Sequence, residues 1–320
     1  MSGSRLVRHI VLAGALGGAV ALGLALVANL PATLDALARF RWRLLPLVLA
    51  AVLLNWALRF VKWHYCVRRL SIPLPIGQSA LVFLGGFTMA ISPGKFGEVL
   101  KALLVRNLVG TEVGRTTSVV MVERLTDVAG LLLLSGLGAT ALPHGRLLLG
   151  TVAALLVLAI AVLRTPALSR VARRLIPERL LIRRVVDPVR GFLGAGRALL
   201  APGVLAVTVL LSIVSWFFEC LAFFLILRGL EAELSVLAAT FLYAFASLAG
   251  AMSMLPGGLG VAEGSLTGLL VSLGTAPPRA AAATLLVRAL TLWLAVGLGL
   301  ATLALAFRGA PQESTAPASR

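Results

Sequence analysis

Two short stretches, Met89–Gly97 (MAISPGKFG) and Met252–Gly260 (MSMLPGGLG), decide the fold, because each interrupts a long apolar region. They share a methionine, a proline and two glycines at the same spacing. Proline lacks the amide hydrogen and restrains the residue before it, so a continuous helix is not expected there. We expect regions 77–108 and 235–274 to be broken, re-entrant hairpins or pairs of discontinuous helices.

The rest of the chain is too apolar for a soluble protein. Of its 320 residues, 59% are hydrophobic and only 13% are charged, whereas soluble domains carry about 25% charged residues. Further apolar stretches approach the length of about 20 residues that a membrane span needs. The sequence therefore predicts an all-α polytopic membrane protein with two broken hairpins and about six full spans, at 10–30, 44–63, 116–142, 147–163, 203–228 and 279–307.

The positive charge indicates the orientation. The formal net charge is +17, and positive residues collect on the cytoplasmic side of membranes, near anionic headgroups. Segment 164–201 should therefore be a cytoplasmic loop, and part of it a surface helix. This places both termini inside a bacterial or archaeal plasma membrane; the shorter basic loop 31–43 disagrees and is outweighed. No nucleic-acid binding is expected. The arginines of the long loop are Arg164, Arg170, Arg173, Arg174, Arg179, Arg183, Arg184, Arg190 and Arg197.

A single membrane domain, residues 1–308, is expected to contain an internal repeat, with residues 44–142 as the first copy and 203–307 as the second. Trp56 and Trp216 lie 160 residues apart, and Val122-Glu-Arg-Leu-Thr resembles Val287-Arg-Ala-Leu-Thr after a one-residue slip. The two copies start on opposite sides of the membrane, which defines an inverted-topology repeat. Chance similarity among Leu- and Ala-rich helices is the alternative. The tail 309–320 is expected to be disordered.

The broken segments are candidate binding elements. Non-helical backbone at membrane depth must be buried in protein or line an aqueous cavity, and the helix after a break presents free amides that favour an anion. Lys95 adds a positive charge beside them, for phosphate contact or, alternatively, for simple snorkelling to water. The residues expected to make the breaks are Pro93, Gly94, Gly97, Pro256, Gly257, Gly258 and Gly260.

One span carries three ionisable residues, Glu123, Arg124 and Asp127. Residues three or four apart share a helix face, and charges within a span must pair or face water. They form either a polar wall for a headgroup or proton, or a structural ion-pair cluster. Arg288, the repeat counterpart of Arg124, needs a carboxylate partner from another segment, and Glu263 and Glu219 are the candidates.

Four further charged residues complete the candidate set. Glu98 and Glu263 each follow a break and are expected to pair with an arginine or carry a proton. Arg59 is expected to reach the cavity, whereas Lys62 is expected at the membrane interface. Catalytic motifs and metal-ligand clusters are not found in the sequence, so neither an enzyme activity nor a cofactor is predicted.

Three ordered motifs, Ser92–Glu98, Val122–Asp127 and Leu255–Glu263, resemble the lysylphosphatidylglycerol synthase transmembrane-region family, also described as flippase-like domains. The resemblance covers roughly residues 10–307. It implies that the motif residues line a region through which lipid is translocated. The synthases of this family carry a soluble aminoacyl-transfer domain after the membrane part, which has no counterpart here, so we expect a stand-alone member that does not make the lipid itself.

The sequence thus predicts a translocase that moves a phospholipid or another headgroup-bearing lipid, such as a polyprenyl-linked one, between the leaflets of the inner membrane. Two alternatives stay open. One is a proton-coupled transporter of small solutes. The other is a non-catalytic membrane subunit whose synthase or glycosyltransferase partner carries the chemistry.

Overall fold

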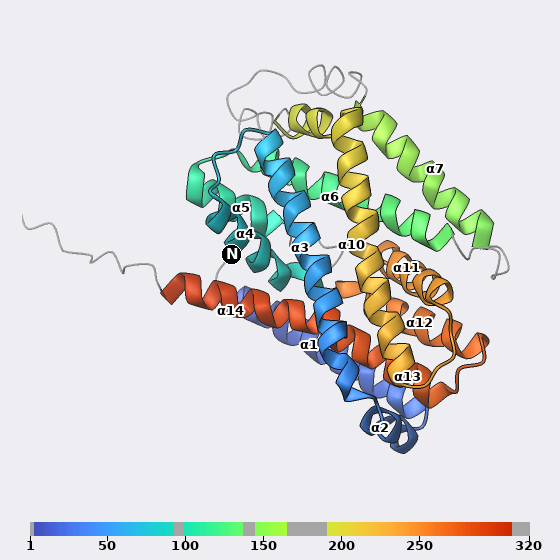
Figure 1. Cartoon of the computed structure of the whole chain (residues 1–320). Helices are drawn as coiled ribbons and strands as arrows, with labels where there is room; N and C mark the ends of the chain where they lie inside the picture. The colour runs from blue at the N-terminus through green and yellow to red at the C-terminus, as the bar shows by residue number, and fades with distance from the viewer. Residues whose placement is uncertain (1–2, 93–98, 137–144, 165–190, 309–320) are drawn as a thin grey trace, which may run out of the picture.

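The computed structural model describes residues 3–92, 99–136, 145–164 and 191–308, which form helices and turns throughout (Figure 1). The α-helices are α1 (Gly3–Val27), α2 (Leu30–Ala38), α3 (Leu45–Arg69), α4 (Ile76–Gly85), α5 (Val99–Val109), α6 (Val113–Gly136), α7 (Gly145–Arg164), α10 (Pro202–Gly229), α11 (Val236–Met252), α12 (Val261–Ser272), α13 (Pro277–Arg288) and α14 (Leu294–Arg308). Short 3₁₀ turns are η1 (Trp42–Leu44), η2 (Gly86–Ile91) and η5 (Pro256–Gly258), and a π-helical turn, η6 (Ala289–Trp293), joins α13 to α14.

The all-helical membrane architecture is confirmed. Within the described residues, three helical stretches are long and apolar enough to cross a membrane, namely Trp42–Arg69, Pro202–Gly229 and Pro277–Ala306. A fourth is counted if Gly14–Val27 and Leu30–Ala38, which meet at a bend of 101°, form one span. Helix α6 occupies the predicted third span but carries Arg115 in addition to the three charged residues noted above.

Helices α3 and α10 run antiparallel, side by side, through the middle of the molecule (Figure 1). The start of α3 meets the end of α10, where the Arg41 amide donates to the Gly229 carbonyl at 3.0 Å. Near their middles, Asn55 Nδ2 donates to the Ser215 carbonyl at 2.7 Å. Further along, Lys62 Nζ donates to Ser212 Oγ at 2.7 Å.

Helix α6 packs against this pair and is enclosed by α10, α11, α5 and α7. The helices approach closely at Gly130, where an added β-carbon would lie 3.1 Å from the Ile213 backbone nitrogen. Small residues at such crossings let membrane helices pack tightly. The charged residues of α6 are therefore surrounded by protein.

The predicted break near Pro256 is confirmed, because α11 ends at Met252 and α12 begins at Val261. Gly257 and Gly258 have φ angles of +61° and +67°, which glycine adopts without steric cost. In the first half, α4 gives way to the 3₁₀ turn η2 and α5 starts at Val99.

The turn between α3 and α4 has the same geometry as the turn between α10 and α11. Ser71 and Glu231, 160 residues apart, both have positive φ angles, of 53° and 57°. The amide of the next residue then donates back into the helix in each case, from Ile72 to Val67 and from Ala232 to Leu227. The Glu231 carboxyl is exposed, and its hydrogen bond to Arg41 lowers its pKa.

Two predictions concern segments outside the described residues, namely the disordered tail 309–320 and most of the basic loop. The last part of that loop is described. Residues 191–199 are helical, and Ala195, Leu199 and Leu200 are buried in the main hydrophobic core. This part of the loop is therefore packed against the membrane domain.

Helix α14 lies directly against η2, and a glycine makes this possible. A β-carbon on Gly299 would lie 2.6 Å from the Thr88 backbone nitrogen, whereas one on Gly297 would have no neighbour within 4 Å. We expect Gly299→Ala to destabilise the protein by about 1–3 kcal/mol through overpacking. Gly297→Ala, the matched control on the same helix, should stay within about 1 kcal/mol of wild type. Thermal unfolding midpoints of the detergent-purified variants would measure this, and equal midpoints would refute the close contact.

Candidate functional site

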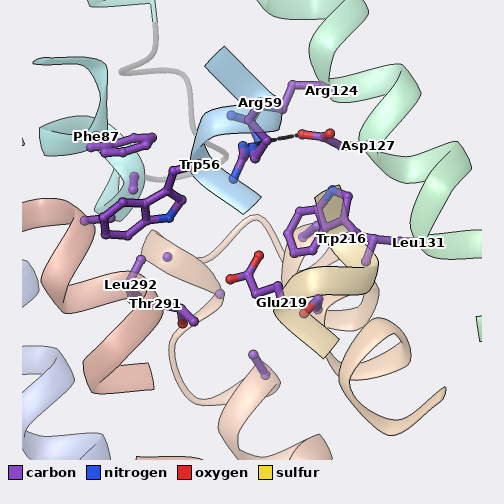
Figure 2. A pocket seen from close by; sticks show the side chains of 18 of the residues that line it. Trp56, Arg59, Phe87, Arg124, Asp127, Leu131, Trp216, Glu219, Thr291 and Leu292 are labelled. Carbon is purple, nitrogen blue, oxygen red and sulfur yellow. Dashed lines mark hydrogen bonds and ion pairs between the residues drawn. The ribbon is translucent and has the colours of Figure 1, made fainter. Parts of the chain in front are cut away.

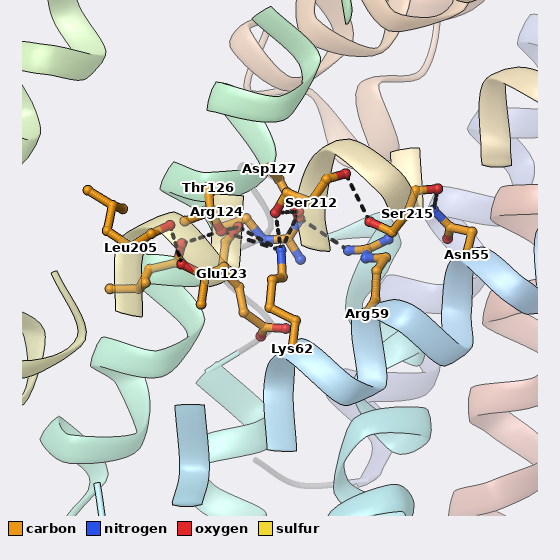
Figure 3. Close-up of polar contacts among 12 residues, drawn as sticks. Asn55, Arg59, Lys62, Glu123, Arg124, Thr126, Asp127, Leu205, Ser212 and Ser215 are labelled. Carbon is orange, nitrogen blue, oxygen red and sulfur yellow. Dashed lines mark hydrogen bonds and ion pairs between the residues drawn. The ribbon is translucent and has the colours of Figure 1, made fainter. Parts of the chain in front are cut away.

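A buried ion pair between Lys62 of α3 and Asp127 of α6 forms the centre of the charged interior (Figure 3). Lys62 Nζ lies 2.5 Å from Asp127 Oδ1, and the exposed fractions of the two residues are 1% and 3%. Lys62 also donates to Ser212 of α10, whose hydroxyl in turn donates to Asp127 at 3.2 Å. Three helices are therefore joined by one hydrogen-bonded network.

The predicted interfacial position of Lys62 is wrong. Its ammonium lies inside the helix bundle and not at the membrane surface. A buried ammonium is tolerated only when it is paired and hydrogen-bonded, and Asp127 on a helix remote in sequence supplies the pair. Helical spacing on α3 alone gave no sign of that partner.

Two arginines extend the network towards open space. Arg59 Nη2 lies 3.5 Å from Asp127 Oδ2, and Arg124 Nη1 lies 3.7 Å from the same oxygen. The predicted contact between Arg124 and Asp127 on one helix face is thus confirmed. The Arg59 guanidinium also lies over the Trp216 ring, 5.5 Å from its centroid, in the geometry of a cation–π interaction.

Glu123 belongs to a second buried pair that the sequence did not reveal. Its Oε2 lies 3.1 Å from Lys101 Nζ on α5. The Lys101 ammonium also lies 4.7 Å from the Trp63 ring centroid and 5.1 Å from that of Phe83. Lys101 is a single charge on a short apolar helix, and its position eight residues after Pro93 was the only available signal.

The second half holds a comparable pair. Arg288 Nε lies 2.6 Å from Glu263 Oε1, which confirms Glu263 as a partner of Arg288. Arg288 Nη2 also donates to the Gly257 carbonyl, and the Gly260 amide donates to Glu263 Oε2, both at 2.7 Å. An anion does lie at the start of the helix after this break, as predicted, but it is the protein's own carboxylate.

A cavity of about 280 Å³ lies between the two halves (Figure 2). Trp56 and Trp216 face it from opposite sides, Arg59 borders it near Asp127, and the Glu219 carboxylate points into it. Among the predicted residues, it is lined by Arg59, Arg124, Asp127, Gly257, Gly258 and Arg288. Glu123 and Glu263 do not line it; they hold its lining residues Lys101 and Arg288.

The lining residues recur at the repeat spacing. On α3 and α10 the offset is 160 residues, and on the later helices it is 164. The corresponding pairs are Trp56 and Trp216, Arg59 and Glu219, Phe83 and Ser247, Gly86 and Gly250, Phe87 and Ala251, Arg124 and Arg288, Asp127 and Thr291, Val128 and Leu292, and Leu131 and Ala295.

Sequence analysis used the two tryptophans only as markers of the repeat and Glu219 only as a possible ion-pair partner. All three line the cavity, together with Tyr243, whose hydroxyl donates to Glu219 Oε1 at 3.0 Å. Charge alone draws attention to ionisable residues, so aromatic lining residues were missed.

The first break lies largely outside the described residues. No position is assigned to the predicted residues Pro93, Gly94, Lys95, Gly97 and Glu98. Their roles remain predictions. The turn η2 just before them lines the cavity through Gly86, Phe87 and Ala90. Both free cysteines, Cys66 and Cys220, are buried, as expected.

The whole chain can be compared with known proteins on this basis. Residues 11–299 match the family described as the lysylphosphatidylglycerol synthase TM region. The chain belongs to this family. A UPF0104 membrane protein of Methanothermobacter thermautotrophicus is 29% identical over 279 residues, which cover 81% of this chain and 82% of that protein. Another UPF0104 membrane protein of the same organism is 29% identical over 122 residues, covering 38% of this chain and 36% of that protein.

Membership of the lysylphosphatidylglycerol synthase TM region family agrees with the apolar helices described above, and the protein is a multi-pass membrane protein. The match extends across both broken regions and both cavity-lining arginines, Arg124 and Arg288. The cavity therefore lies within the part of the chain that defines the family.

The Lys101–Glu123 pair tests whether these charges hold the interior together. Lys101→Met leaves a buried carboxylate without its ammonium, which costs about 3–5 kcal/mol. The double substitution Lys101→Met with Glu123→Met should recover most of that loss, because an apolar pair needs no charge compensation.

Unfolding midpoints of both variants would be compared with that of Arg39→Met, which breaks an exposed pair with Asp35 and should cost at most about 1 kcal/mol. A double variant less stable than Lys101→Met alone would contradict this account.

Proposed function

We propose that the protein is a lipid translocase, not an enzyme, and that the cavity between its halves carries the headgroup of a phospholipid across a prokaryotic plasma membrane. The observation that carries this proposal is the convergence of Arg59, Arg124 and Arg288 on one cavity inside a membrane domain. Guanidinium groups bind phosphate through parallel charge-assisted hydrogen bonds. Charges inside a membrane protein mark the path of a polar substrate.

An inverted-topology repeat is the architecture that we propose for this movement. Its support is the antiparallel packing of α3 on α10, in which Asn55 bonds to Ser215, its own counterpart 160 residues later. A contact between equivalent residues is typical of a two-fold axis. The duplicated turn at Ser71 and Glu231 and the paired lining residues agree with it.

In the proposed mechanism the headgroup occupies the cavity while the acyl chains stay in the bilayer. Substrate sites of inverted-repeat transporters lie between the repeats, and rocking of one repeat against the other exposes the site to alternate sides. The repeats here would contribute one arginine each at equivalent positions, Arg124 and Arg288. We propose about six full spans and two re-entrant hairpins, with both termini in the cytoplasm.

Removal of one arginine tests the proposal. Arg124→Gln should slow lipid movement at least about tenfold, because a charge-assisted hydrogen bond contributes about 1.5–3 kcal/mol. Folding should survive, because Asp127 keeps Lys62 and Arg59 as partners. The measurement is the rate at which acyl-labelled phospholipids in proteoliposomes become accessible to a membrane-impermeant quencher.

Arg39→Gln, an exposed arginine far from the cavity lining, is the matched control and should match wild type. Wild-type protein that fails to accelerate any phospholipid, or an Arg124→Gln rate equal to that of wild type, would overturn the proposal.

A further inference from the structure

The two halves of the cavity differ in charge at one pair of equivalent positions. Arg59 follows Trp56 by three residues on α3, and Glu219 follows Trp216 by three residues on α10. All four residues line the cavity. Residues three apart on a helix share a face, so the repeat presents a tryptophan and a charge to the cavity twice, with a cation in one half and an anion in the other.

The side of the cavity near Arg59 is built to donate hydrogen bonds. Arg59 is held by Asp127 and lies over the Trp216 ring. Arg59 Nε and Trp216 Nε1 are buried donors for which the described residues supply no acceptor. A phosphate oxygen is an acceptor that would satisfy such donors, and Arg124 adds a second guanidinium to the same lining.

The side formed by Glu219 has the opposite character. Glu219 is 7% exposed, and the Tyr243 hydroxyl donates to its Oε1 at 3.0 Å. Figure 2 shows its carboxylate directed into the cavity, between the two tryptophans. A carboxylate offers about four acceptor sites, so one phenol leaves capacity for an N–H donor. In a site for phosphate alone, this negative charge would repel the ligand.

We propose that Glu219, with the rings of Trp56 and Trp216 beside it, is an ammonium subsite. Carboxylates bind alkylammonium groups through charge-assisted hydrogen bonds, and indole rings attract cations. This inference rests on the proposed translocation, and it defines the substrate as a zwitterionic phosphodiester lipid. The cavity of about 280 Å³ requires the ammonium to be joined to the phosphate by a short link, as in a phosphoethanolamine headgroup.

Binding and movement can be measured separately. Binding of short-chain phosphatidylethanolamine and phosphatidylglycerol to the full chain in detergent is followed by tryptophan fluorescence. Movement of the long-chain, acyl-labelled forms of both lipids is followed in proteoliposomes. Wild type should favour the ethanolamine lipid in both measurements, and Glu219→Gln should reduce that preference about tenfold while leaving the glycerol lipid unchanged or faster.

Tyr243→Phe is a second variant, because it removes only the hydroxyl that orients Glu219. It should shift the preference in the same direction by a smaller factor. Arg39→Gln is the control and should show the wild-type preference in both measurements.

The outcomes separate the two proposals. If wild type binds the ethanolamine lipid selectively and Glu219→Gln abolishes that selectivity, the subsite stands even when neither lipid moves, and only the proposed translocation fails. If Glu219→Gln weakens both lipids equally, or wild type shows no preference, Glu219 has a structural role and the ammonium subsite is refuted.

Discussion

The rest of the structure depends on one constraint, which is that charge placed inside a membrane domain must be compensated by protein. Lys62 and Asp127 meet this constraint at 2.5 Å, and the hydroxyl of Ser212 completes the contact. Leaving either charge alone in a dry interior costs several kcal/mol. The pair therefore fixes how α3, α6 and α10 pack together, and that packing positions Arg59 and Arg124 at the edge of the cavity.

The repeated architecture preserves geometry more closely than chemistry. The turn after α3 recurs after α10 with the same backbone conformation, and the cavity lining recurs at matching positions. Yet Asp127 corresponds to Thr291, and Arg59 corresponds to Glu219. Two-fold geometry supplies a symmetrical frame for a site that opens to either side, while the substituted side chains make the two walls chemically different.

Local sequence predicted what local physics determines. The Pro256 break and the contact of Arg124 with Asp127 follow from backbone chemistry and helical spacing, and the need of Arg288 for a carboxylate follows from the cost of a buried charge. The partners of Lys62 and Lys101 did not follow, because they come from helices far away in the chain. The sharp bend of 101° after Val27 was missed for a related reason, since the apolar stretch 10–30 reads as one continuous span.

The central claim is that two oppositely oriented halves enclose the charged interior, and side-specific labelling tests it most directly. Ser71 and Glu231 occupy equivalent exposed turns after α3 and α10. Each would be replaced by cysteine in a background in which the buried Cys66 and Cys220 are alanine. In intact cells, an impermeant maleimide should label Glu231→Cys from outside and Ser71→Cys only after permeabilisation. Labelling of both positions from the same side would contradict the account.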